Sequence, residues 1–202
     1  MGKKTLSFDQ IEVDSNIKMF AGVVGFGVCI AMEGVGMRSR SELDALVAKV
    51  GAALVADDKM IVTAESCTGG LIAECLTRVS GSRSWFDRAY ITYSYESKRE
   101  MLGVRETTIQ KKGAVSRECV EEMVVGALQQ SHAKVSVACS GIAGPTGGTP
   151  DKPVGTVWIA WAKQGHDKVE TRLYHFDGDR DQVRQACVEA SLEGVLALLD
   201  CD

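Results

Sequence analysis

The order of strand-type and helix-type segments from residue 39 onward is the feature that most restricts how this chain can fold. Short β-rich runs alternate with amphipathic stretches, and two adjacent strand-type runs follow. The expected strands are 60–64, 89–93, 134–140, 156–163 and 169–176, and the expected helices are 71–79, 96–102, 116–130, one starting at 39 and one opening at 179. This order predicts an α/β fold in which helices cover both faces of a mixed sheet.

Boundary signals support several of these helices. Residues 39–42 read Ser-Arg-Ser-Glu, which matches a capping box before an apolar helical face. Ser116 is expected to cap the helix 116–130, and Gly103 to close the helix 96–102. We therefore assign one domain to residues 39–202.

Residues 1–38 show neither a sustained 3.6-residue nor a 2-residue period. We interpret them as an N-terminal extension of unknown role, either disordered or the product of an upstream start codon. Met37 is an equally plausible start. The apolar run 20–32 has 13 residues, fewer than the roughly 18 to 20 that span a bilayer, so no membrane segment is expected.

Charge and cysteine content argue against a nucleic-acid-binding protein, a disulfide-stabilised protein and a zinc ribbon. Acidic residues (27) outnumber basic ones (23), and the net charge of −4 argues against direct nucleic-acid binding. Seven scattered cysteines without a C-x-x-C pair indicate neither a disulfide framework nor a zinc ribbon. We expect a reducing, cytoplasmic location and no metal or other cofactor.

Ser66 stands where a predicted strand passes into a helix, with Gly69 and Gly70 just beyond it. A hydroxyl here is exposed beside unpaired helix amides that can hold an oxyanion or a phosphate. On local grounds alone, a capping role for Ser66 is about twice as probable. The three histidines are poorly placed to form a Ser/His triad. Cys67 is expected to be reactive if the helix start lowers its pKa.

Lys98 is the candidate base, one turn into the short helix after Tyr93. A desolvated lysine can lose its proton and act as a general base, although most lysines on short helices are solvated. The glycine-rich loop 141–155 and the pair Arg180 and Arg184 offer candidate anion-binding groups, for which a long turn and surface charges are the alternatives.

Six motifs occur in a fixed order that resembles the CinA C-terminal domain family. They are AESCTGG at 64–70, TYS at 92–94 with Lys98, GAVS at 113–116, SGIAGP at 140–145 with Gly147 and Gly148, KPVGTV at 152–157, and GDR at 178–180. The resemblance covers about four-fifths of the chain. It implies a three-layer α/β/α sandwich with a central mixed sheet.

Characterised members of that family are nicotinamide-nucleotide amidohydrolases, which convert nicotinamide mononucleotide and water to nicotinate mononucleotide and ammonia without metal. The resemblance implies that Ser66 is the nucleophile, that Lys98 is its base and that Tyr93 assists by hydrogen bonding. It places Thr68, Gly69 and Gly70 as oxyanion donors, and Ser140, Gly141, Gly144 and Arg180 near the ribose phosphate. We expect a homo-oligomer with a small-molecule nucleotide substrate and no membrane partner.

Two positions depart from the family pattern. Tyr95 stands where asparagine is usual, and Ser140 replaces the usual threonine. A bulky phenol within three residues of the proposed base could reshape the pocket. A second hypothesis therefore stays open, in which the chain is a catalytically silent nucleotide-binding or regulatory protein. A third, a DNA-associated factor, conflicts with the acidic net charge.

Overall fold

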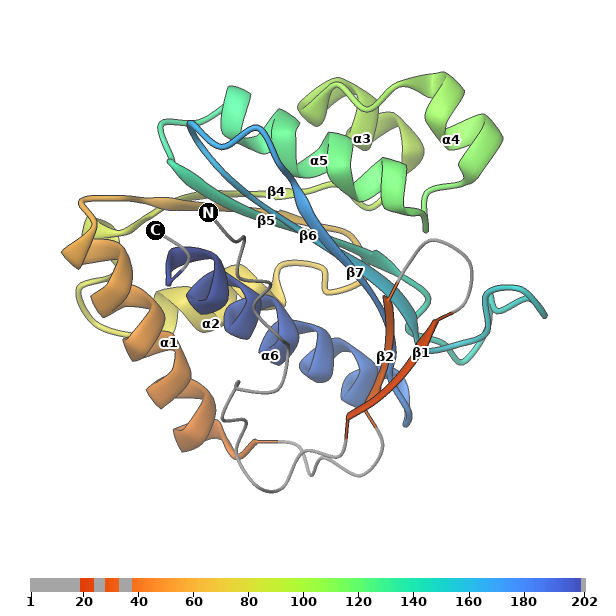
Figure 1. The fold of residues 1–202 in the computed structure, drawn as a ribbon, viewed down its shortest axis with the longest axis horizontal. Coiled ribbons are helices and arrows are strands. Elements are labelled where there is room, and N and C mark those ends of the chain that lie inside the picture. Colours follow the sequence, from red (N-terminus) through yellow and green to blue (C-terminus); the bar gives the residue numbers. More distant parts are fainter. Residues whose placement is uncertain (1–18, 24–27, 33–37, 201–202) are drawn as a thin grey trace, which may run out of the picture.

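A single seven-stranded mixed sheet forms the centre of the protein (Figure 1). The computed structural model describes residues 19–23, 28–32 and 38–200, with side chains from 38 to 200. The strands are β1 (Met19–Val23), β2 (Val28–Met32), β3 (Ile61–Glu65), β4 (Phe86–Ile91), β5 (Val135–Gly141), β6 (Thr156–Lys163) and β7 (Glu170–His175). They lie in the order β1-β2-β7-β6-β5-β3-β4. The pairs β3/β4, β3/β5 and β2/β7 are parallel and the others antiparallel.

Helices cover both faces of this sheet, as the element order predicts (Figure 1). One face carries α1 (Arg40–Ala56), α2 (Leu71–Arg78) and α6 (Arg180–Leu199), and the other carries α3 (Tyr95–Leu102), α4 (Glu106–Lys112) and α5 (Arg117–Gln129). Two separate apolar cores result, one on each face. The predicted three-layer α/β/α sandwich is confirmed.

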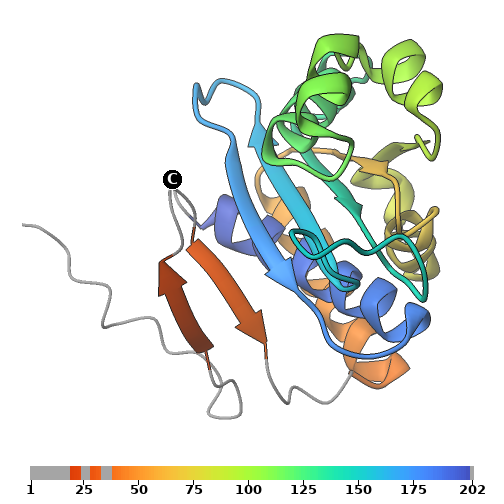
Figure 2. The ribbon, with the colours of Figure 1, turned by 90° about the vertical axis from the view of Figure 1, so that its right-hand side faces the viewer.

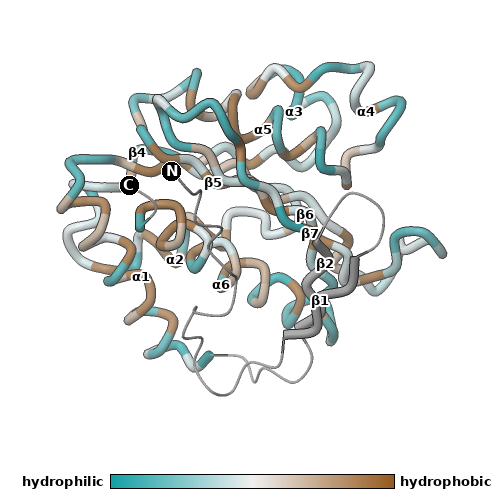
Figure 3. Tube along the Cα trace, viewed as in Figure 1, coloured by the Kyte–Doolittle hydropathy of each residue, from teal (hydrophilic) through white to brown (hydrophobic). Residues whose placement is uncertain are grey.

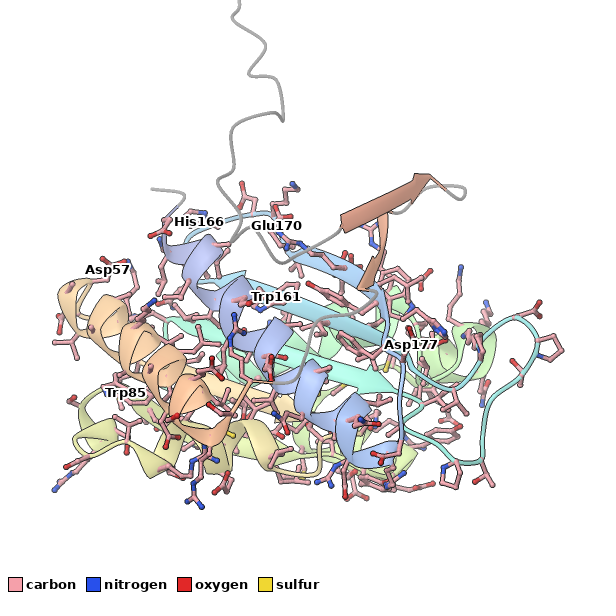
Figure 4. The ribbon with its side chains drawn as sticks, turned by 90° about the horizontal axis from the view of Figure 1, so that it is seen from below. Asp57, Trp85, Trp161, His166, Glu170 and Asp177 are labelled. Carbon is pink, nitrogen blue, oxygen red and sulfur yellow. The ribbon has the colours of Figure 1, made fainter. Side chains whose placement is uncertain are left out.

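Two tryptophans set how closely the helices approach the sheet. Trp85 lies against Gly51 of α1 and Trp161 against Gly194 of α6, where an added Cβ would come within 2.7 and 2.2 Å of the rings (Figure 4). The Trp161 indole N–H also donates to the Ser191 carbonyl at 2.9 Å. Burial of such large rings contributes to the apolar stabilisation of this layer. Apolar residues also recur along α1 at the spacing that places them on one buried face of the helix (Figure 3).

The predicted helix boundaries at Ser39, Gly103 and Ser116 are confirmed. Ser39 and Glu42 form the capping box of α1, Gly103 closes α3 in a left-handed conformation, and the Ser116 hydroxyl accepts from the amide of Cys119. These signals succeed because each depends on contacts within one turn of helix.

Helix α4 was not expected from the sequence. Its N-cap, Arg105, makes no side-chain capping bond, and only Thr108 and Ile109 are buried. A carboxylate of α5 holds this helix instead, because Glu122 accepts from the Arg105 amide at 2.8 Å and from the Thr108 hydroxyl at 2.7 Å. The helix therefore depends on tertiary contacts that local patterns do not reveal.

Strands β1 and β2 lie within the segment interpreted as an N-terminal extension, and neither was expected. β2 pairs with β7 from Cys29↔Leu173 to Ala31↔His175, so the two strands continue the sheet beyond β7 (Figure 2). The remainder of the extension, residues 1–18, 24–27 and 33–37, lies outside the described residues. Among the described helices, none combines the length and apolar character needed to cross a bilayer.

Candidate active site

The candidate site lies at the carboxyl end of β3, where the chain turns into α2. Gly69 and Gly70 complete this turn with φ values of 62° and 100°, a left-handed conformation that favours glycine. The Gly69 amide donates to the Ser66 carbonyl at 3.1 Å, which closes a tight turn directly after the serine. The turn thereby places Ser66 just beyond the carboxyl end of β3.

A buried carboxylate, that of Glu65, holds the turn in place. Glu65 is fully buried. It accepts five hydrogen bonds, from the hydroxyls of Thr63 and Thr68 and from the amides of Gly70, Ile72 and Ala73. Three of these donors are amides at the N-terminal end of α2, one from its N-cap Gly70 and two from its first turn, where a negative charge is stabilised. Burial nevertheless raises the pKa of Glu65 above its ordinary value.

Lys98 reaches Ser66 from the opposite face of the sheet. Helix α3, capped by Ser94, directs the Lys98 Nζ to within 3.0 Å of the Ser66 Oγ and 2.5 Å of the Thr92 carbonyl. Both Lys98, 1% exposed, and Ser66, 9% exposed, are buried. The two residues are separated by 32 positions in the sequence, and the structure brings them into direct contact.

Burial lowers the pKa of the Lys98 amine below its ordinary value. The nearby thiols of Cys119, Cys139 and Cys67 oppose this shift and favour the charged form. In the described part of the chain, the amine bonds to a hydroxyl and a carbonyl, with no carboxylate among its hydrogen-bond partners. A lysine in such surroundings is suited to accept a proton.

Tyr93 belongs to a second cluster at the mouth of the site. Its hydroxyl accepts from Arg180 Nη2 at 2.9 Å, and Arg180 Nη1 donates to the Gly144 carbonyl at 2.8 Å. Tyr93 is 60% exposed. The structure therefore joins Tyr93 to the predicted phosphate-binding residues Arg180 and Gly144, whereas its assistance to catalysis by hydrogen bonding stays a prediction.

Two of the predicted oxyanion donors have hydrogen-bond partners within the turn. The Gly69 amide donates to the Ser66 carbonyl and the Gly70 amide to Glu65, so both are engaged within the turn. The Thr68 hydroxyl also donates to Glu65, at 2.7 Å. Of the three predicted residues, Thr68 thus remains a candidate through its backbone amide. Local spacing could not show that a neighbouring carboxylate takes these donors.

Ser140 and Gly141 lie on the strand next to Ser66. Glu65 is paired with Cys139 in the parallel register of β3 and β5, so Ser66, which follows the end of β3, is next to Ser140, which continues β5 by one further pair. Ser140 is buried. At Gly141, an added Cβ would lie 2.5 Å from Val157, so close packing alone already requires glycine.

Arg184 and Tyr95 complete the surroundings of the site. Arg184, from α6, donates to the Thr68 carbonyl at 2.9 Å and thereby ties the α6 helix to the Ser66 turn. Tyr95, which departs from the family pattern, is 57% exposed at the start of α3. The phenol therefore extends largely into solvent and does not fill the buried space around Lys98.

Two further results differ from the sequence analysis: the pKa of Cys67 and the role of Glu65. Cys67 does not have the depressed pKa that its place near a helix start suggested, because contact with Cys139 and burial raise the pKa of its thiol well above the usual range. The role of Glu65 was missed. An acidic residue at the end of an apolar strand, three residues before a Thr-Gly-Gly turn, was the available signal.

Comparison with known protein families matches residues 43–199 to the CinA C-terminal domain. Similar proteins include the nicotinamide-nucleotide amidohydrolases PncC of Escherichia coli K12, 48% identical, and of Pseudomonas putida, 50% identical. Each alignment covers 76% of this chain and, respectively, 92% and 94% of the relative.

Solved structures agree with this relationship. The competence/damage inducible protein CihA from Agrobacterium tumefaciens superposes with a TM-score of 0.76 at 38% identity, over 82% of this chain and 99% of that one. A CinA superfamily protein from Klebsiella pneumoniae gives 0.74 at 37% identity, over 81% and 99%. On this evidence the chain belongs to the CinA C-terminal domain family.

Proposed function

We propose that this protein hydrolyses the carboxamide of nicotinamide mononucleotide to nicotinate mononucleotide and ammonia, with Ser66 as nucleophile and Lys98 as base. The substrate class follows the names of its relatives from Escherichia coli and Pseudomonas putida. The observation that carries the proposed chemistry is the contact of 3.0 Å between the Lys98 amine and the Ser66 hydroxyl inside a buried site.

The neutral form of Lys98 fits both of its hydrogen bonds. One amine N–H donates to the Thr92 carbonyl. The amine also donates to the Ser66 hydroxyl in the structure, and in the proposed neutral form this contact reverses, so that the nitrogen lone pair accepts the hydroxyl proton. As that proton moves to Lys98, the Ser66 oxygen attacks the carboxamide carbon. The Thr68 amide is the proposed donor to the oxyanion that forms.

Ammonia and water complete the cycle. Lys98 returns the proton to the leaving amide nitrogen, so ammonia departs and an ester between Ser66 and the nicotinate carboxyl remains. A water molecule then attacks this ester while Lys98 accepts a proton from it. Release of the carboxylate returns that proton to Ser66. No external oxidant or reductant enters the reaction.

The nucleotide phosphate is proposed to bind near Arg180. Its guanidinium uses two of its donors on Tyr93 and Gly144 and has further donors for an anion.

Five free cysteines in the described residues fit a reducing cytoplasm. We also propose a homo-oligomeric state, which light scattering on the purified protein tests.

Ammonia release from nicotinamide mononucleotide tests the activity. We expect turnover by the parent protein in the presence of a chelator, and its loss in Ser66→Ala and in Lys98→Ala. Ser41→Ala and Lys111→Met, which alter exposed residues of α1 and α4, serve as matched controls and should retain turnover.

Two results would contradict the proposal. Persistent turnover in Ser66→Ala would exclude the nucleophile. An inactive parent that still binds the nucleotide in calorimetry would support the silent binding protein instead, and Tyr95→Asn would then be the substitution to test for recovery of turnover.

A further inference from the structure

Three cysteine thiols meet directly behind the Ser66 turn. The Sγ atoms of Cys67, Cys139 and Cys187 all lie within 4.8 Å of one another, and all three residues are buried. They come from the turn after β3, from β5 and from α6. No pair among them is close in sequence, so the cluster exists only in the folded chain.

The cluster has the composition of a metal-binding site. Soft thiolate ligands select thiophilic ions such as Cu⁺, Zn²⁺ and Cd²⁺. With metal–sulfur bonds of about 2.3 Å, sulfurs on one zinc ion lie about 4 Å apart. The described separations therefore require less than about 1 Å of closure, and a larger soft ion requires less. The Thr68 hydroxyl lies 3.2 Å from the Cys139 Sγ, as one further polar atom at the cluster.

We propose that Cys67, Cys139 and Cys187 bind one soft, thiophilic metal ion and that its binding inhibits the enzyme. Binding of a divalent ion releases three protons and forms three metal–sulfur bonds, with no change of oxidation state. The three thiols take no part in the reaction proposed for Ser66 and Lys98, although Cys67 and Cys139 lie close enough to Lys98 to affect its pKa.

Inhibition follows from the position of the three ligands. Cys67 directly follows Ser66, and closure around an ion displaces this neighbour of the nucleophile. Cys67 is 5% exposed and borders Ser66, so the ion is expected to enter from the substrate side. The inhibitory part of the proposal rests on the proposed function, whereas metal binding does not.

Cadmium titration of the reduced full chain tests the binding site. We expect one Cd²⁺ per chain by native mass spectrometry and a thiolate-to-cadmium charge-transfer band in the ultraviolet. Cys187→Ser and Cys139→Ser should weaken binding by about tenfold or more, since each removes one of three soft ligands. Cys75→Ser, which alters a buried free thiol outside the cluster, is the matched control and should bind normally.

Background binding is removed by Cys29→Ser and Cys201→Ser, because these two side chains lie outside the described residues. Cys187→Ala, checked by circular dichroism, replaces Cys187→Ser if the latter fails to fold. A band that survives loss of Cys187, or disappears in Cys75→Ser, overturns the site.

Turnover gives the second readout. Cd²⁺ should inhibit ammonia release by the parent and inhibit Cys187→Ala at least about tenfold less effectively. A saturated cadmium band with unchanged turnover overturns inhibition. An inactive parent that shows the band leaves the metal site supported and overturns the proposed function together with inhibition.

Discussion

Two ionisable side chains buried at the same site, Glu65 and Lys98, have opposite surroundings. Glu65 accepts five hydrogen bonds, three of them from amides at the start of α2. Lys98 has a hydroxyl and a carbonyl as hydrogen-bond partners, and burial lowers its pKa. Burial shifts the pKa of both groups towards the neutral form, but the Glu65 carboxyl is fixed in the scaffold by five hydrogen bonds, whereas the Lys98 amine has few partners and is available for proton transfer.

The contrast indicates that Glu65 has a structural role and that Lys98 is suited to a chemical one. A buried charge with many donors around it resists change, and its removal leaves those donors unsatisfied. A buried amine with few partners is destabilised when charged and is available for proton transfer. Substitution of Glu65 should therefore reduce mainly stability, and substitution of Lys98 should reduce mainly activity.

The largest effect is expected from Lys98→Met. Removal of the proposed base should lower ammonia release by about 10³-fold or more, within the usual range for loss of a general base. The melting temperature should not fall at neutral pH. Burial lowers the folded-state pKa of Lys98, so below the ordinary lysine pKa the amine reduces stability rather than adding to it.

Calorimetry and steady-state kinetics on the same preparation check this prediction. Lys111→Met, on the exposed surface of α4, is the control. A large drop in melting temperature with residual activity would reverse the contrast between the two buried groups.

Glu65→Gln tests the other side of the comparison. The carboxamide presents an N–H₂ group where the carboxylate accepted from amides, so at least one donor of α2 loses its acceptor. We expect a loss of about 1 to 3 kcal/mol in the free energy of unfolding, measured by urea denaturation. Glu74→Gln on the exposed face of α2 should cost only about 0.3 to 0.5 kcal/mol through its pair with Arg78. Equal losses would show that the buried network is not special.

The pH dependence of kcat/KM sharpens the assignment of Lys98. The proposed mechanism requires the neutral amine, so activity should rise with pH through the pKa of Lys98 in the free enzyme. Because burial lowers that pKa, the midpoint of the acidic limb should lie below the ordinary lysine value of about 10.4. A midpoint at or above that value would argue against a desolvated base.

The smallest effect is expected from Tyr93→Phe, outside the buried pair. The substitution removes the acceptor of the Arg180 hydrogen bond, at a largely exposed position. A hydrogen bond of this kind contributes about 0.5 to 1.5 kcal/mol, so KM should rise about two- to tenfold with little change in kcat. A fall in kcat comparable to that of Lys98→Met would instead place Tyr93 in the chemical step.

The fold was largely predictable because its signals are local. The capping box at Ser39, the strand before Ser66 and the cap at Asp179 depend on a few neighbouring residues. Helix α4 and the strands β1 and β2 were not predictable in the same way, because they depend on pairing with distant elements.

The candidate site was predictable only in part. Motif order singled out Ser66 and Lys98, but it could not show that Glu65 takes the Gly70 amide or that Tyr93 bonds to Arg180. Both features require the positions of atoms from several elements at once.

Local periodicity and caps thus specified the alternating elements and put a serine at a strand end, since each signal acts over one or two turns of chain. Folding brought together groups that are far apart in sequence: the Lys98 amine against Ser66 across the sheet, and three thiols from the Ser66 turn, β5 and α6. The order β5-β3-β4 and the placement of helices on opposite faces set these contacts, because sheet order, and not sequence distance, determines which strand ends are neighbours.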